Sequence, residues 1–190
     1  MKEIEVKAYI TSVEVFRKKL EDLGCQFGDP LIQEDFIFFP IGIGFPDIIK
    51  DTPIVRVRDS NGTAILTMKK RITGDNELIK LEKEVVVSDR QEAMEIVEHM
   101  GFHMAAKVHK KRIECTRNDM TICIDEVDGL GNFIEVEKMS ESINDKEIQD
   151  ELFDFLRSLG VNDNDRATKG YDILLNEKTA SNESKRSRVM

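Results

Sequence analysis

Carboxylates stand at every second position in three short stretches of the sequence. These pairs are Glu3 and Glu5, Glu82 and Glu84, and Glu135 and Glu137, each set among β-branched or aliphatic residues. Side chains alternate between the two faces of a strand, so both members of each pair would point the same way. Like charges side by side are unfavourable unless their face also holds metal ions or basic side chains. The pattern therefore predicts a shared ionic face whose hard oxygens suit Mg²⁺ or Mn²⁺.

Basic residues follow the same two-residue period. Lys7 continues the face of Glu3 and Glu5, and Lys80 precedes Glu82 at the same parity. Five further bases are predicted on this face by their parity, together with the acid Asp125: Arg56 and Arg58, which alternate with Val55 and Val57, then Lys69, and the pair Lys110 and Arg112. Buried charge is costly even when paired, so an ionic face that extends over many strands predicts a wet lumen or cleft rather than a dry core.

Three amphipathic helices are expected, one after each acidic strand. Each has apolar residues at helical spacing and ends at a glycine: Gly24, Gly101 and Gly160. Thr11 with Glu14 and Ser88 with Gln91 match the capping-box pattern at the start of the first two helices. A tight turn at 59–62 and another at 128–132 indicate hairpins, hence antiparallel pairing.

These elements predict an α+β fold. About eight strands would close into an antiparallel β-barrel, a tunnel with a charged lumen, and the helices would cover its aliphatic outer face. We expect a single domain over residues 1–175, with a loop at 40–53 that could act as a lid and a last short helix at 171–175. Residues 176–190 are polar and poorly patterned, which favours a mobile tail.

Composition narrows the function classes. The chain has 190 residues and a net charge of −9, which argues against broad binding to nucleic acid or to anionic membranes. Its three cysteines and the absence of a signal-peptide pattern favour reduced thiols in a cytoplasmic protein, and no apolar run is long enough to span a bilayer. A homodimer is compatible with these features.

The combined pattern resembles a known family. The start Glu3-Ile4-Glu5-Val6-Lys7 is similar to the ExExK signature of the CYTH superfamily, the triphosphate tunnel metalloenzymes. The resemblance extends to about Leu175 and includes the segments 56–58, 66–69, 82–84, 110–112, 125–131, 133–137 and 169–171. Residues 33–40 and the helix at 12–27 are similar to the CyaB-type class IV adenylate cyclases within that superfamily.

The resemblance implies a role for each matching residue. The implied metal ligands are Glu3, Glu5, Glu135 and Glu137, with Asp125 near the metal. The residues implied to grip a triphosphate are Lys7, Arg56, Arg58, Lys69 and Arg112, helped by Lys169 and by Lys110 or Lys111. Since Lys110 and Lys111 are adjacent, only one can share the face of Arg112, and parity favours Lys110. Lys80 belongs with the substrate-binding set, and Glu82 and Glu84 would orient the bases or hold a second ion.

Three functions remain open at this point. The first is a class IV adenylate cyclase-like enzyme that converts ATP to cyclic AMP and pyrophosphate with Mg²⁺ or Mn²⁺. The second is a triphosphatase that hydrolyses thiamine triphosphate, inorganic triphosphate or a nucleotide. The third is a non-catalytic polyphosphate binder, which the number of metal-ligand candidates disfavours.

Overall fold

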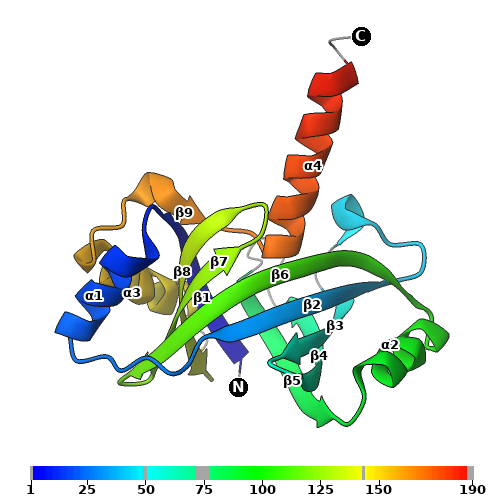
Figure 1. The fold of residues 1–190 in the computed structure, drawn as a ribbon, viewed down its shortest axis with the longest axis horizontal. Coiled ribbons are helices and arrows are strands. Elements are labelled where there is room, and N and C mark those ends of the chain that lie inside the picture. The colour runs from blue at the N-terminus through cyan, green and yellow to red at the C-terminus, as the bar shows by residue number, and fades with distance from the viewer. Residues whose placement is uncertain (1, 49–50, 72–77, 143, 188–190) are drawn as a thin grey trace.

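The computed structural model describes residues 2–48, 51–71, 78–142 and 144–187. Eight antiparallel strands form a closed barrel in the order β5-β4-β3-β2-β6-β7-β8-β1, and β1 closes the barrel by pairing with β5 (Figure 1). The strands are β1 (Lys2–Ile10), β2 (Leu31–Pro40), β3 (Pro53–Ser60), β4 (Thr63–Arg71), β5 (Ile79–Val87), β6 (Phe102–Arg117), β7 (Met120–Val127) and β8 (Gly131–Ser140). A two-residue strand, β9 (Arg166–Ala167), adds to β1. The predicted eight-stranded barrel is confirmed.

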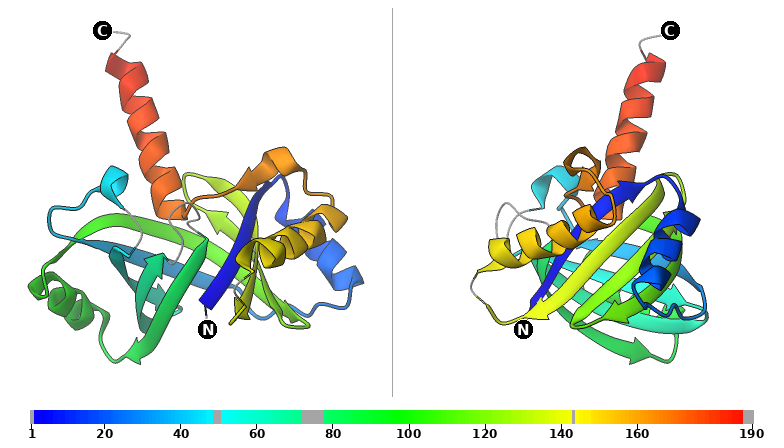
Figure 2. Two further views of the ribbon diagram at one scale, coloured as in Figure 1. Left: turned by 180° about the vertical axis from the view of Figure 1, so that it is seen from behind. Right: turned by 90° about the vertical axis from the view of Figure 1, so that its left-hand side faces the viewer.

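The aliphatic faces of the strands point outward, under helices. On β1, Ile4, Val6 and Ala8 are fully buried in a core with the apolar residues of α1 (Val13–Asp22) and α3 (Asp145–Ser158). α2 (Arg90–His99) covers a second core, on the outer side of β2, β3 and β4. Figure 2 shows α1 and α3 together at one end of the barrel and α2 at the other. The interior face is thus left to the charged residues.

Local signals explain where the elements begin and end. The β3–β4 hairpin turns at Asn61 and Gly62, which have φ angles of 49° and 83°. That left-handed conformation is what a two-residue Asn-Gly turn requires. The N-caps of the first two helices lie one residue later than the sequence pattern suggested: Ser12 accepts from the Val15 N–H, and Asp89 accepts from the Glu92 N–H. In each helix the predicted and the observed cap are both residue types that cap helices well, so the pattern located the helix start to within one residue.

Two irregular regions flank the barrel mouth. In the expected lid at 40–53, a short 3-10 helix spans Phe45–Asp47, and residues 49–50 lie outside the described residues. Phe45 packs with Ile37, Phe39 and Ile54 in an apolar cluster. A second 3-10 helix, Asp163–Asp165, precedes β9.

The last helix is longer than expected. α4 runs from Tyr171 to Ser187, so the structure continues as helix through most of the segment predicted as a polar tail. Its first turns pack on the barrel through Leu174 and Leu175, and the rest projects away from the barrel (Figure 1). Residues 188–190 lie outside the described residues, and the mobility of the segment stays a prediction. None of the described helices is long and apolar enough to cross a membrane.

Candidate functional site in the barrel lumen

A cavity of about 310 Å³ occupies the barrel interior. Its described lining has nine acidic and nine basic side chains. Among them are thirteen of the residues predicted from the sequence: Glu3, Glu5, Lys7, Arg56, Arg58, Lys69, Lys80, Glu82, Glu84, Lys110, Arg112, Glu135 and Glu137. The structure therefore brings most of the predicted set together in one place, as the strand parity required.

A network of buried side chains surrounds Glu135 in the cavity wall. Lys7 Nζ lies 2.8 Å from Glu135 Oε1, and Arg112 Nη2 donates to the other oxygen. Arg112 also makes a two-point contact with Asp125, at 2.7 and 2.5 Å. Burial by itself would raise the pKa of Glu135, but Lys7 and Arg112 hold it well below its ordinary value. Glu135 is therefore a permanent anion that fixes two cations.

A second two-point contact holds Arg58. Its Nε and Nη2 donate to the two oxygens of Asp35, at 2.5 and 2.7 Å. Both side chains are buried, and they stand opposite each other on β2 and β3. Burial opposes ionisation of Asp35, yet the hydrogen bonds and charge of Arg58 lower its pKa far below the ordinary value. The fork geometry keeps Arg58 in one orientation.

Glu82 and Glu84 organise the cations of the opposite wall. Lys69 Nζ donates to Glu82, whose pKa falls to about 2 despite burial because Lys69, Lys80 and other cations surround it. Arg56 Nη2 lies 3.4 Å from Glu84 Oε2 and 3.2 Å from Thr67 Oγ1. Burial and the neighbouring Arg56 lower the pKa of Lys69 to about 8.

Glu3 and Glu137 have a different environment. Within the described part of the chain, neither carboxylate forms an ion pair with a basic side chain. Burial raises the pKa of Glu137 to about 8, and the charge of Glu3 adds to the effect. The pKa of Glu3 is raised as well, chiefly by burial. Glu137 also stands directly opposite Glu5 in the β1–β8 register.

Several buried atoms of the cavity wall lack a hydrogen-bond partner among the described residues. They are Glu5 Oε1, Gln33 Oε1 and Arg56 Nε. Lys7 Nζ lies 3.1 Å from Glu5 Oε1, but without hydrogen-bond geometry. Buried polar atoms are normally satisfied, so these atoms in the lining of the cavity are available to a polar ligand or to water.

The carboxylates suit a hard cation. No cluster of three or more metal-ligating side chains is preformed among residues 2–48, 51–71, 78–142 and 144–187. A Mg²⁺ site does not need one, because this ion is usually held by one or two carboxylates, with water and substrate phosphates as its other ligands. Glu3 and Glu137, together with the orphan oxygen of Glu5, fit that requirement.

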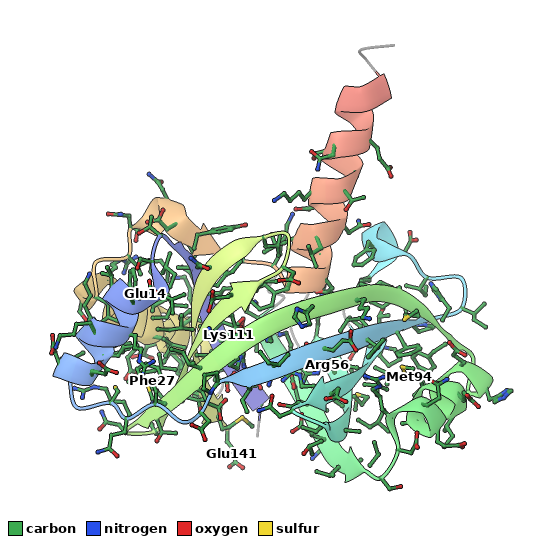
Figure 3. All side chains as sticks on the ribbon, in the orientation of Figure 1. Glu14, Phe27, Arg56, Met94, Lys111 and Glu141 are labelled. Atoms are coloured by element: carbon green, nitrogen blue, oxygen red, sulfur yellow. The ribbon has the colours of Figure 1, made fainter. Side chains whose placement is uncertain are left out.

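Three predicted residues lie elsewhere. Lys111 points out of the barrel and pairs with Glu126 at 2.9 Å, so the choice of Lys110 by parity is the correct one (Figure 3). Lys169 does not line the cavity and pairs with Glu177 on α4, with 40% of its side chain exposed. Asp125 is fully buried behind Arg112 and Lys110, so it orients these bases rather than opening onto the cavity.

Sequence reasoning missed several residues of the cavity wall, among them Asp35 and Tyr171. Asp35 stands at the same parity as Gln33 within the apolar run of β2, and this period-two signal could have identified it. Tyr171 lies in a helix, so strand parity gives no signal for its position in the cavity wall.

Comparisons with known proteins agree with this geometry. The CYTH domain family matches residues 1–171. A Methanocaldococcus jannaschii protein named "Putative adenylate cyclase" is 28% identical over 172 residues, which cover 90% of this chain and 97% of that protein. A protein structure from Pyrococcus horikoshii has a TM-score of 0.77 at 30% identity and covers 93% of this chain and 99% of its own.

A more distant structure shares the fold. It comes from Hippeastrum, has a TM-score of 0.62 at 15% identity over 93% of this chain and 95% of its own, and is described as an adenylyl cyclase candidate with a dominant triphosphatase activity. The barrel, its ionic lumen and the match over residues 1–171 lead to one assignment: this chain belongs to the CYTH family.

Proposed function

We propose that this protein is a metal-dependent enzyme that binds a triphosphate inside the barrel and catalyses attack at one of its phosphorus atoms. The observation that carries the proposal is the cavity lining, which combines guanidinium and ammonium groups with two carboxylates, Glu3 and Glu137, that form no ion pair among the described residues. A metal-bound polyphosphate has the complementary pattern of charge.

The cations would hold the phosphates in a fixed orientation. Arg58 and Arg112 are each locked by a two-point contact with an aspartate, so they need little reorganisation to bind phosphate oxygens. The buried Nε of Arg56 has no hydrogen-bond partner among the described residues, and Lys7, Lys69, Lys80 and Lys110 add positive charge to the lining. Groups that are fixed in advance can stabilise charge that develops on a leaving phosphate.

The metal would be held by Glu3 and Glu137, helped by Glu5. When bound, Mg²⁺ or Mn²⁺ would neutralise charge on the phosphate oxygens and on the leaving group. The basic side chains of the lining would bind and orient the triphosphate next to these three carboxylates.

Cyclisation of ATP is the first candidate reaction. The ribose 3′-hydroxyl would attack the α-phosphorus, pyrophosphate would leave, and cyclic AMP would form. The name of the 28% identical relative supports this choice. The apolar side chains of Ile37, Ile54 and Val108 on the cavity wall also favour a substrate with an organic group over inorganic triphosphate.

Hydrolysis is the second candidate. Water in place of the ribose hydroxyl would release orthophosphate from a nucleotide, from thiamine triphosphate or from inorganic triphosphate. The triphosphatase activity described for the Hippeastrum protein makes this alternative specific enough to test.

Product analysis distinguishes the two reactions. Purified protein is incubated with ATP, thiamine triphosphate or inorganic triphosphate, each with Mg²⁺ or Mn²⁺, and with Glu137→Gln as the matched control. Cyclic AMP with pyrophosphate supports the cyclase, and orthophosphate supports the hydrolase. Binding without turnover of any substrate would contradict both and favour a polyphosphate binder.

A further inference from the structure

Tyr171 is one of three α4 residues that line the cavity, with Asp172 and Ile173, and its ring contacts two cations of the lumen. It is the first residue of the helix, is 7% exposed and lines the cavity. Its hydroxyl donates to Asp125 Oδ2 at 2.9 Å. Its ring lies beneath two ammonium groups: Lys7 Nζ is 3.9 Å from the ring centroid and Lys110 Nζ is 5.1 Å from it.

The ring is held in place from the other side. Phe133 meets it edge to face, with centroids 4.9 Å apart, and Tyr9 packs against Phe133 at 4.5 Å. Val108 and Ala167 belong to the same buried cluster. Because these contacts fix the ring, its position can determine where the two ammonium groups lie.

An aromatic ring suits this task better than another carboxylate would. The face of the ring attracts an ammonium group but carries no net charge, so it does not neutralise the lysine. Lys7 already has Glu5 and Glu135 as anionic partners, and Lys110 has Asp125. One more anion would compete with phosphate for the same cations.

We propose that Tyr171 is a positioning residue, whose ring holds Lys7 and Lys110 toward the triphosphate while its hydroxyl anchors the Asp125–Arg112 pair. The helix α4 is then part of the active site rather than an appendage to the barrel. This inference rests on the proposed function, because it requires that the two lysines bind phosphate.

Fluorination of the ring tests the inference with little change in shape. Tyr171→Phe first removes the hydroxyl, and mono-, di- and trifluorinated phenylalanines at position 171 then weaken the negative face of the ring step by step. We expect the affinity for inorganic triphosphate, measured by calorimetry, and kcat/KM for the turned-over substrate to fall together along the series, about three- to tenfold in total. Equal values along the series would overturn the inference.

Phe36 provides a matched control. Its ring lies on the outer side of the barrel, under Arg90 at 5.1 Å and Lys107 at 5.0 Å. The same fluorinated residues at position 36 should leave binding and kcat/KM unchanged, and an equal loss there would show that fluorination acts through general stability.

Two further readouts separate the possible failures. The ring current of Tyr171 should shift the Lys7 Hε resonances upfield, and Tyr171→Leu should remove that shift; its absence in the unmodified protein would overturn the placement. If the unmodified protein neither binds nor turns over any triphosphate, the proposed function fails and this inference fails with it. If it does both and the fluorinated series is flat, only the role of Tyr171 is wrong.

Discussion

Glu135 and Glu137 lie two residues apart on β8 and face the same cavity, yet they belong to different regions of it. We call the network of Glu135, Lys7, Arg112 and Asp125 the inner region, and Glu3 with Glu137 the outer region. In the inner region every carboxylate has a cation within hydrogen-bond distance, and the pKa of Glu135 is low although burial opposes this. In the outer region the pKa of Glu137 is raised to about 8 by burial and by Glu3.

The difference separates two tasks. The inner region is neutralised by its own residues, so it can fix the cations in position without any ligand. The outer region has two carboxylates that form no ion pair with a basic side chain among the described residues, so it suits a cation from solution that would displace the proton of Glu137. In the metal-free protein, removing a charge from the inner region should therefore lower the free energy of unfolding, whereas removing one from the outer region should leave it unchanged or raise it.

The largest effect on stability is expected in the inner region. Arg112→Met would leave Asp125 and Glu135 as buried carboxylates with one cation fewer each. Breaking a buried ion pair from one side costs about 3–5 kcal/mol of unfolding free energy. Urea unfolding of the metal-free protein at pH 7 measures this free energy, and Lys111→Met serves as the exposed control. If Arg112→Met lowered the unfolding free energy by less than about 1 kcal/mol, the inner network would be contradicted.

The largest effect on activity without loss of stability is expected in the outer region. Glu137→Gln keeps the shape of the side chain and removes its charge. Metal-dependent turnover should fall on the order of 100-fold, as for the loss of one preorganised electrostatic group. The metal-free protein should melt no earlier than the unmodified one. Full activity with Mg²⁺ or Mn²⁺ would exclude Glu137 as a metal ligand.

The pH dependence of stability should sharpen the same contrast. The pKa of Glu137 is about 8 in the folded protein, against an ordinary value of 4.5. Between these two values the unfolded chain has lost the proton and the folded protein keeps it, so folding becomes less favourable as pH rises. In EDTA, the stability gained by Glu137→Gln should be small near pH 4.5 and grow until about pH 8. A difference that stays constant over this range would contradict the raised pKa.

Strand parity explains how much of this site could be predicted. The period of two places Glu3, Glu5 and Lys7 on one face whatever the details of packing, and the observed register confirms that face. Parity also selected Lys110 over Lys111. It applies only within a strand, and for that reason it could not place Tyr171 or Lys169, whose positions depend on how α4 docks on the barrel.

The division of the cavity into an inner and an outer region also could not be predicted from the sequence. Glu135 and Glu137 have the same parity and similar neighbours, and only the register decides that Lys7 stands opposite the first and Glu5 opposite the second. The length of α4 was underestimated for a related reason. Its residues after Leu175 have no apolar face to pack against the barrel, so hydrophobic periodicity gives no signal there, although Asn176, Glu177 and Lys178 are compatible with a helix.

The smallest effects on stability and on triphosphate affinity are expected for Lys111, which lies just outside the cavity wall. Lys110 is 3% exposed within the lumen, whereas the side chain of its neighbour Lys111 is 49% exposed and pairs only with Glu126 among its described contacts. Exposed ion pairs contribute about 0–1 kcal/mol, so Lys111→Met should change stability by no more than that and leave triphosphate affinity unaltered. Lys110→Met should weaken triphosphate binding, since it removes a buried charge from the lining. Calorimetric titration of both variants with inorganic triphosphate compares two adjacent lysines on opposite faces of β6. If Lys111→Met weakened binding as much as Lys110→Met, general surface charge rather than the lumen would account for the affinity.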